Sequence, residues 1–537
     1  MNFINRAFKN VTRKFSKSIL LVITFFVIGN FVIIGLGVAN AAEKAKTLTR
    51  QKMRAVVTYG IDYNAVWEYA ETIEDEEERN EFYEKNYPKI KLNDIKDVLT
   101  DSRVSTANAF ISASQAFKTD EYDFVHLNNE AEQQMNNQND TECVFDESNQ
   151  QRCFKYYMPT HFVKANMFPN MIEFVDGGYE VVDGSFYSQE QIDNAEPVLL
   201  ISKAFAEVNN LKVGDKYSFY ISSPNELEYF EGLDATLDDL LVEFEIIGIF
   251  DHQSKITPDS SNFNYTYPYE NPDNMLLMPG TSYIKQGINW AQKTYDYYAQ
   301  KNPNEEYYQN PENRPSYENI ENNSVNDVTF LLNDPLIVDE FVESYSKKLP
   351  QFIKLDANNE EFKRLSKPLD TLELYANFII WLVVINAIII ISLVTALTLK
   401  TREYEIGVLL SIGASKIKII GQFFVELALV AVLGFTLAIA SGSIVANKVG
   451  QTVLTYQIQE SDVDKDGDYY RDDSIWNNDY STEVTLDDLV QEYNVTVSPI
   501  IIGEIYVLGL GIVLVSILIP SLMIMRFNPK KILMNQN

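Results

Sequence analysis

The sequence is poor in the residues from which catalytic and nucleotide-binding sites are usually built. Three histidines and two cysteines occur among 537 residues. His126, His161 and His252 are far apart, and no nucleophile–base–acid arrangement can be assigned around them. No G-x-x-x-x-G-K-[ST] motif occurs, because SIGASK at 411–416 lacks both the spacing and the following hydroxyl residue. We therefore expect no catalysis and no ATP binding by this chain.

Basic residues are also scarce. The chain has 44 Lys and Arg against 76 Asp and Glu, a formal net charge of −32. Nucleic acid is excluded as a partner by this balance, since phosphate contacts require clustered basic residues. The charge is unevenly distributed, because four long apolar segments hold almost none of it. Such segments are typical of a membrane protein rather than of a cytosolic enzyme.

The four segments predict four transmembrane helices. Each is long enough to cross about 30 Å of hydrocarbon, which takes about 20 residues. We expect them at residues 19–39, 376–399, 419–446 and 505–525. Asn30 and Asn386 lie inside the first two, and we expect them to hydrogen-bond between helices. Residues 1–18 alternate apolar and basic side chains at helical spacing, which favours an amphipathic helix and an uncleaved anchor over a signal peptide.

The basic residues predict the orientation. Residues 1–18 carry five basic and no acidic residues, residues 400–418 carry four basic and two acidic ones, and the tail 526–537 carries three basic ones. Basic flanks stay on the cytoplasmic side. We therefore expect a multi-pass protein of the cell membrane with both termini and 400–418 in the cytoplasm, and with 40–375 and 447–504 outside.

The segment 40–375 is long enough for a domain with its own core. Helices at 43–69 and 360–375, continuing the first two spans, would form a stalk, with Pro368 at a kink or a helix start. Between them, short strands and helices predict a mixed α+β domain that is not a β-barrel, with a β-α-β unit at 325–355. Cys143 and Cys153 both lie in this domain, where either a disulfide or two free thiols would be compatible with the sequence.

A short cytoplasmic stretch carries the most specific pattern. It reads REYEIGVLLSIGASKIK at 402–418, and the tail reads IPSLMIMRFNPKKIL at 519–533. Together with GGYEVVDGSFYS at 177–188, PVLLISKAFAE at 197–207, LKVGD at 211–215 and FEIIGIF at 244–250, these segments resemble the ABC transporter permeases typified by FtsX, MacB and the lipoprotein-releasing permeases. The outer segments resemble the extracytoplasmic core domain of that family.

The resemblance implies that the stretch between spans two and three is a coupling helix that docks on a separate ATPase. An interfacial helix without that role is the alternative. The turn after it would be made by Gly413, and we expect Arg402, Glu403 and Glu405 to remain available to a partner. The candidate coupling residues are Arg402, Glu403, Glu405, Ile406, Gly407, Gly413 and Ala414.

Two acidic features stand outside this pattern. Glu426 lies seven residues into the third span, about 10 Å deep, so it should face other helices and act as a structural or coupling residue, with ion transport as a weaker alternative. DVDKDGDYYRDD at 462–473 approaches a calcium loop, in competition with a plain acidic turn. Its candidate ligands are Asp462, Asp464, Asp466, Asp468 and Asp473.

The sequence thus predicts an α-helical membrane protein with four transmembrane helices and a large mixed α+β extracytoplasmic domain between helices one and two. By resemblance it is an ABC permease subunit, a homodimer or a heterodimer with a related permease, in contact with membrane lipid. ATP and Mg²⁺ would be bound by a separate ATPase subunit. The expected activity is export of peptide-like, lipoprotein or antimicrobial compounds; the alternative is activation or sensing of an extracellular partner such as a cell-wall hydrolase.

Overall fold

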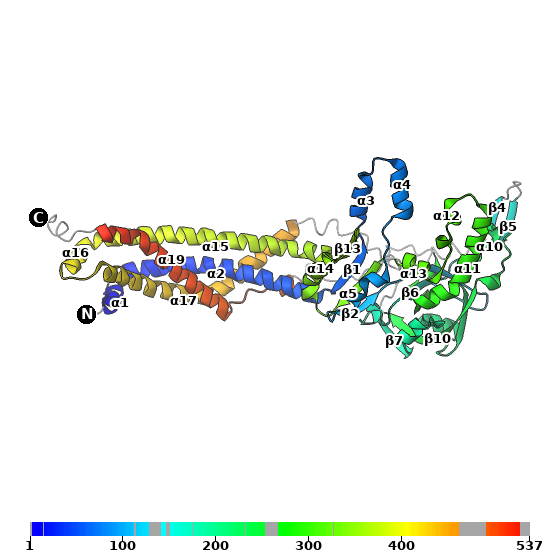
Figure 1. Ribbon diagram of the computed structural model, residues 1–537. Helices are drawn as coiled ribbons and strands as arrows, with labels where there is room; N and C mark the ends of the chain where they lie inside the picture. The colour runs from blue at the N-terminus through cyan, green and yellow to red at the C-terminus, as the bar shows by residue number, and fades with distance from the viewer. Residues whose placement is uncertain are drawn as a thin grey trace. The chain divides into compact units, whose positions relative to one another are not determined.

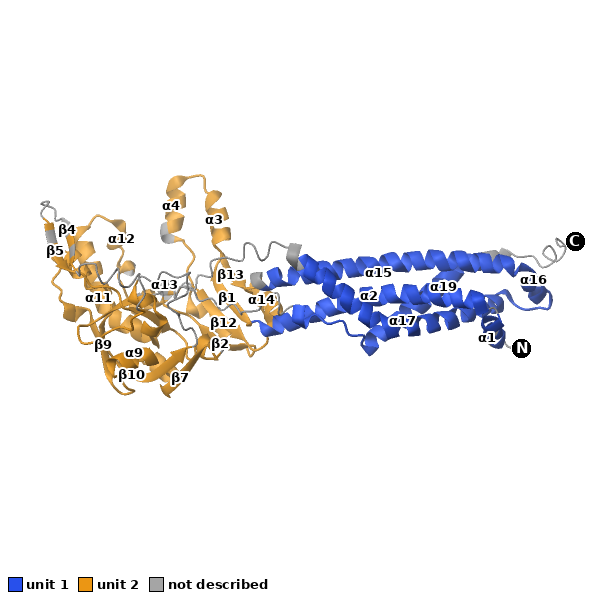
Figure 2. Cartoon of the chain, turned by 180° about the vertical axis from the view of Figure 1, so that it is seen from behind, with its two compact units in different colours: residues 1–53, 360–469, 482–537 blue, residues 54–359, 470–481 orange. Residues whose placement is uncertain are grey.

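The computed structural model describes residues 3–13, 15–111, 114–127, 141–145, 151–175, 177–230, 232–252, 267–325, 327–460 and 490–526. The chain divides into two compact units (Figure 2). The helical unit comprises 1–53, 360–469 and 482–537, and the α+β unit comprises 54–359 and 470–481.

The helical unit contains four helices that are long and apolar enough to cross a membrane, as the sequence predicted. Two shorter helices, α1 and α16, accompany them. The bounds are α1 Phe3–Arg13, α2 Phe15–Lys52, α15 Glu360–Thr401, α16 Glu403–Ser411, α17 Lys416–Glu460 and α19 Pro499–Arg526. Pro368 and Pro520 lie inside α15 and α19.

Small residues allow α2 and α17 to approach closely. A Cβ atom on Gly29 would lie 2.7 Å from the Cβ of Ala438. A Cβ on Gly434 would lie 2.6 Å from the Cβ of Phe25. In a membrane, where the hydrophobic effect does not draw helices together, such close packing is a main source of association.

The two asparagines of the spans differ. Asn30 accepts a hydrogen bond from Ser441 Oγ of α17 at 3.1 Å, which confirms the expected contact between helices. Asn386 is exposed and donates to the carbonyl oxygen of Leu382 in its own helix at 2.8 Å. The expectation of an interhelical bond is therefore wrong for Asn386 within the described part of this chain.

The expected helix at 43–69 is confirmed as far as Lys52 and is wrong beyond it. Helix α2 ends at Lys52, and strand β1, Val56–Ile61, follows. Strand β1 pairs with a neighbouring strand on each of its two edges. The hydrogen bonds to these strands therefore outweigh the helical pattern of its sequence. The helices α2 and α15 do pack together, and Lys46 Nζ lies 2.9 Å from Asp370 Oδ1 and 2.7 Å from Glu373 Oε2.

The α+β unit contains a four-stranded sheet in the order β13-β1-β12-β2. Strand β12 (Asp327–Leu332), helix α14 (Val338–Ser346) and strand β13 (Ile353–Asp356) confirm the predicted β-α-β unit, with β1 inserted between its two strands. Strand β2 spans Val104–Asn108.

A second sheet of seven strands has the order β7-β10-β8-β11-β6-β3-β9, and an additional β9–β10 pairing closes six of them into a ring. The unit is the mixed α+β domain that the sequence predicted, and it contains a closed ring of strands that the sequence did not indicate. Closure depends on the 12-residue strand β10, which pairs with β9 through its first half and with β7 through its second. The strands are β3 Ser114–Lys118, β6 His161–Asn166, β7 Tyr179–Gly184, β8 Val198–Ser202, β9 Lys216–Tyr220, β10 Leu241–His252 and β11 Met275–Pro279.

Helices and one hairpin surround the sheets. The helices are α3 Tyr63–Glu71, α4 Glu76–Lys85, α5 Lys96–Leu99, α7 Ile172–Val175, α8 Gln189–Asp193, α9 Lys203–Asn209, α10 Glu226–Tyr229, α11 Gly280–Lys301, α12 Glu306–Gln309 and α13 Tyr317–Ser324. The hairpin strands β4 (Thr141–Phe145) and β5 (Gln151–Lys155) carry the disulfide Cys143–Cys153, which confirms the bonded alternative.

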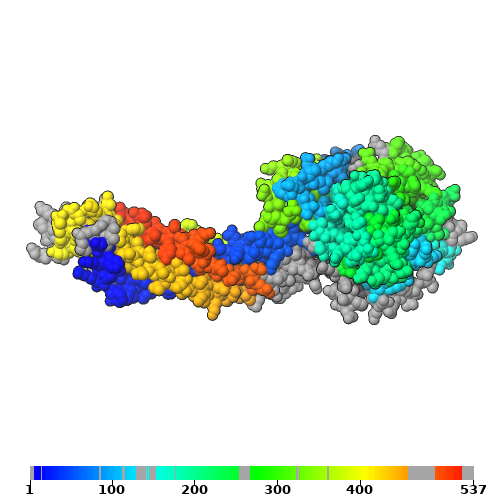
Figure 3. Space-filling view, turned by 90° about the horizontal axis from the view of Figure 1, so that it is seen from below, coloured from blue at the N-terminus to red at the C-terminus, as the bar shows by residue number. Residues whose placement is uncertain are grey.

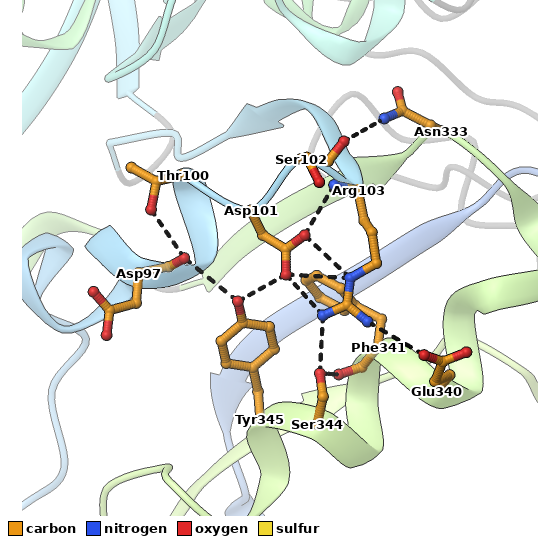
Figure 4. A network of polar contacts seen from close by, with 10 residues as sticks. All are labelled: Asp97, Thr100, Asp101, Ser102, Arg103, Asn333, Glu340, Phe341, Ser344 and Tyr345. Atoms are coloured by element: carbon orange, nitrogen blue, oxygen red, sulfur yellow. Dashed lines mark hydrogen bonds and ion pairs between the residues drawn. The ribbon is translucent and has the colours of Figure 1, made fainter.

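An ion-paired network fixes α14 against the turn before β2 (Figure 4). The Arg103 guanidinium donates to both carboxylate oxygens of Asp101, with Nη2 2.7 Å from Oδ2, and lies 4.9 Å from the ring centroid of Phe341. Tyr345 Oη donates to Asp101 at 2.9 Å. These bonds hold the pKa of the Asp101 carboxyl well below its usual range.

A fully buried histidine, His161, begins strand β6 of the six-stranded ring. His161 Nδ1 is 2.9 Å from the carbonyl oxygen of Asn274, and its Nε2 is 2.6 Å from Tyr217 Oη. Desolvation by burial lowers the pKa of His161 from 6.5 to about 4. Because the unfolded chain binds this proton more readily, stability is full above pH 6.5 and is lost as the pH falls toward 4.

We predict that the α+β unit loses about 3 kcal/mol of stability between pH 6.5 and 4, because the unfolded chain binds a proton at His161 that the folded unit excludes. Thermal unfolding of the full chain in detergent, followed across that range, measures the effect. His161→Gln should flatten the dependence, whereas His126→Gln, at a side chain 39% exposed, should leave it unchanged. Equal pH dependence in wild type and His161→Gln would contradict the assignment.

Candidate coupling site between two spans

Helix α16 is a compact connector between the long helices α15 and α17. Gly413 has φ +93°, which a residue with a side chain rarely adopts. The amide of Gly413 donates to the carbonyl of Leu410 at 3.1 Å and that of Ala414 to the carbonyl of Leu409 at 3.0 Å, the pattern of a Schellman cap. Ser415 Oγ accepts from the amide of Lys418 at 3.4 Å as α17 begins. The expected tight stop at Gly413 is confirmed.

The inner face of α16 is anchored to both neighbouring helices. Ile406 is buried together with Leu399 of α15 and with Ile419 and Phe423 of α17. Gly407 is also buried, and Ala414 packs at the edge of this cluster. A displacement of α16 is therefore passed directly to two membrane-spanning helices.

Arg402, the residue between α15 and α16, holds the ends of three helices together. Its Nε and Nη2 atoms donate to the two carboxylate oxygens of Glu405 at 2.8 and 2.9 Å, a bidentate pair. Nη1 donates to Glu426 Oε2 at 2.8 Å. The guanidinium carbon lies 4.6 Å from the ring centroid of Phe423. The side chain of Arg402 is only 6% exposed.

The Glu426 carboxylate is satisfied by donors from three segments. Besides Arg402, its Oε1 accepts from Asn10 Nδ2 of α1 at 2.8 Å and from Gln422 Nε2 of α17 at 3.0 Å. The carboxylate is 14% exposed. The prediction that Glu426 faces other helices is thus confirmed, and we call Asn10, Arg402, Glu405, Gln422 and Glu426 the carboxylate network.

Helix α1 belongs to this site. It packs along α17, and Figure 3 shows its dark blue surface against the gold surface of that helix. Ala7 is fully buried, whereas Phe8 remains 61% exposed. A cavity beside the carboxylate network is lined by residues of α1, α2, α15 and α17, among them Asn10, Ser18 and Thr395.

Two expectations about the connector need revision. Arg402 is not available to a partner, because its guanidinium is buried and fully engaged inside the chain. Glu405 is 47% exposed but also committed to Arg402. The outward side chains are instead Tyr404, Ile412 and Ile417, which are 54%, 78% and 79% exposed. The sequence analysis did not single out Ile412, Ile417 or Asn10, although two isoleucines beside a glycine turn were a readable signal.

Some of the predicted site residues lie outside the part of the chain that the structure describes. Asp462, Asp464, Asp466, Asp468 and Asp473 lie outside the described residues, so the calcium loop stays a prediction. Within the described ranges, no group of three or more His, Cys, Asp and Glu side chains could hold a metal ion. Of the tail motif, Pro529 and Leu533 also lie outside them.

We predict that Arg402→Gln lowers the stability of the helical unit by about 3 kcal/mol, because a buried carboxylate loses its cation. The double variant Arg402→Gln/Glu426→Gln should recover much of that loss. Lys46→Gln, which removes a more exposed pair, should cost less than about 1 kcal/mol. Thermal unfolding in detergent compares the variants, and a double variant no more stable than Arg402→Gln would contradict the pairing.

Comparison with known protein families finds a match within the helical unit. Residues 377–529 match the family described as FtsX-like permease C-terminal. Over the full length of both chains, the sequence is 26% identical across 545 residues to YclI of Bacillus subtilis (strain 168), an uncharacterized ABC transporter permease.

Two solved extracytoplasmic domains are similar to part of this chain. The periplasmic region of MacB from Actinobacillus actinomycetemcomitans is 8% identical, covers 57% of this chain and 91% of its own, and has a TM-score of 0.25. The extracellular domain of YknZ, a noncanonic ABC-type transporter from Gram-positive bacteria, is 9% identical, covers 50% and 89%, and has a TM-score of 0.23.

The matched segment contains three of the four candidate spans, the connector α16 and Glu426. Residues 377–529 are therefore similar to the FtsX-like permease C-terminal family, and the whole chain is similar to an ABC transporter permease.

Proposed function

We propose that this chain is the membrane subunit of an ABC complex and that it transmits ATP-driven movement of a separate ATPase to its spans through α16. Both termini and α16 lie in the cytoplasm in this proposal, and the α+β unit lies outside. The basic residues flanking the four spans support that orientation.

The carboxylate network is the observation that carries the proposal. Arg402 bonds to Glu405 within α16 and to Glu426 in α17, while Asn10 ties α1 to the same carboxylate. Charged side chains inside a span are costly and are kept where they have a role. A rigid link of this kind lets a force on the short helix α16 act on α1, α15 and α17 together.

The outward side chains of the connector provide the docking surface for the ATPase. Tyr404, Ile412 and Ile417 project from a segment that also carries Glu403, Lys416 and Lys418. An exposed apolar side chain between charged ones is typical of the core of a protein interface with a polar rim. We place the contact here rather than on Arg402.

The assembly would contain a second copy of the chain or a related permease and two ATPase subunits, which bind ATP and Mg²⁺. The α+β unit would then capture or expel a peptide-like, lipoprotein or antimicrobial compound at the outer surface. The similarity to permeases of the FtsX-like family supports transport in general.

We predict that Tyr404→Asp/Ile412→Asp abolishes co-purification of the ATPase while the chain remains folded, since both side chains are exposed and lie outside the buried cluster. Affinity purification of the tagged chain in mild detergent, followed by mass spectrometry, measures the partner. The matched control is Tyr307→Asp/Leu336→Asp, at two side chains of the α+β unit that are 56% and 44% exposed.

Recovery of an ATPase with wild type and control, but not with the α16 variant, would support the proposal. If wild type brings down no ATPase while monodisperse, the transporter assignment fails. If both variants retain the ATPase, the contact lies elsewhere. Outer proteins that co-purify would distinguish export from activation of an extracellular partner.

A further inference from the structure

Two short helices of the α+β unit form a hairpin with little of its surface covered. Helices α3 and α4 project from the four-stranded sheet (Figure 1). In α4 the side chain of Phe82 is buried, and Arg79 donates through Nη1 to the carbonyl of Ile73 at 3.4 Å. Most other described side chains of α4 are exposed. Ordering such a segment has an entropic cost that its own packing hardly offsets.

The hairpin is nevertheless built to stay folded. Asp62 caps α3 through a bond from the amide of Ala65, and Asp75 accepts from the amides of Glu77 and Glu78 at the start of α4. Its inner face packs Val66, Ala70 and Phe82 together, with Phe82 5.2 Å from the ring centroid of Tyr69. The hairpin is therefore a defined element with a fixed inner and outer side.

Its outer side displays aromatic rings. Tyr63 and Trp67, one helical turn apart on α3, are 61% and 60% exposed. Tyr83 on α4 is 44% exposed and stacks on Tyr87 with ring centroids 6.2 Å apart. We call Tyr63, Trp67 and Tyr83 the aromatic face. Exposed aromatic groups of this size mark interaction sites more often than isolated surface residues do.

The surrounding charge selects the class of partner. Residues 62–85 contain ten acidic and two basic residues. Aromatic faces attract ammonium and guanidinium groups, and the acids add a long-range attraction for the same cations. An anionic membrane surface would be repelled by this charge, so lipid is a poorer match than a basic peptide.

We propose that the aromatic face of the α3–α4 hairpin binds a lysine- or arginine-bearing peptide segment. The cationic side chains lie over Tyr63, Trp67 and Tyr83, and the acidic residues around the rings orient them. This inference goes beyond the proposed coupling to an ATPase and does not depend on it.

The probe is a synthetic lysine–leucine peptide, compared with a glutamate–leucine peptide of equal length, titrated calorimetrically against the full chain in detergent. We expect the basic peptide to bind, the acidic one not to bind, and the affinity to fall with added salt. Tyr63→Ala/Trp67→Ala should weaken binding about tenfold. The control Tyr307→Ala/Tyr317→Ala, at rings 56% and 37% exposed, should not change it.

A second pair of variants distinguishes the effect of the acidic residues of the hairpin on binding from the effect of the negative charge of the whole chain. Glu68→Gln/Glu71→Gln/Glu74→Gln should weaken binding, whereas Glu180→Gln/Glu190→Gln/Glu343→Gln, at exposed positions elsewhere in the unit, should not. Equal losses for hairpin and control variants would mean diffuse attraction and would overturn the proposal. Absence of binding by wild type, or binding to phosphatidylglycerol vesicles in place of the peptide, would overturn it as well.

Trp67→Phe provides an independent readout on the same site. A ring that contacts the peptide should contribute a fluorescence change on binding that disappears in this variant, although Phe keeps the helix and much of the ring attraction. An unchanged signal in Trp67→Phe would place the peptide elsewhere. ATPase co-purification with the same variants should be normal, so failure here leaves the coupling proposal standing.

Discussion

A carboxylate inside a membrane-spanning helix must be supplied with donors, and this requirement governs the helical unit. Glu426 meets it with Arg402, Asn10 and Gln422, which belong to three different segments of the chain. Leaving the charge unpaired in such a place costs several kcal/mol. The positions of α1, α16 and α17 are therefore not independent, because each supplies part of one polar site.

The other residues of the connector also hold α15, α16 and α17 together. The cap at Gly413 turns the chain within two residues, and Ile406 fills the space between α15 and α17. Apolar packing sets the distance between the helices, and the carboxylate network sets their register. The contrast with Lys46 is instructive, since its pairs with Asp370 and Glu373 are more exposed and contribute less. The carboxylate network is the more buried of the two links between helices.

Sequence reasoning was most successful where a single physical rule dominates. Hydropathy alone located the four spans, since backbone polar groups in lipid leave few alternatives to a helix. The glycine turn was also predictable from local chemistry. Pairings between distant residues were not: β1 looked helical until its two partner strands were known, and β10 closes a ring through residues 20 or more positions away. Arg402 was assigned to a partner because nothing in the local pattern shows that Glu426, 24 residues later, returns to it.

The central claim is that the carboxylate network fixes α1 to the connector. The most direct test is the distance between spin labels at two exposed positions, Lys9→Cys on α1 and Ser411→Cys on α16. Both natural cysteines are held in a disulfide and would not be labelled. The account predicts one narrow distance distribution for the otherwise native chain and a broadened one when Arg402→Gln is added. The same narrow distribution in both proteins would contradict it.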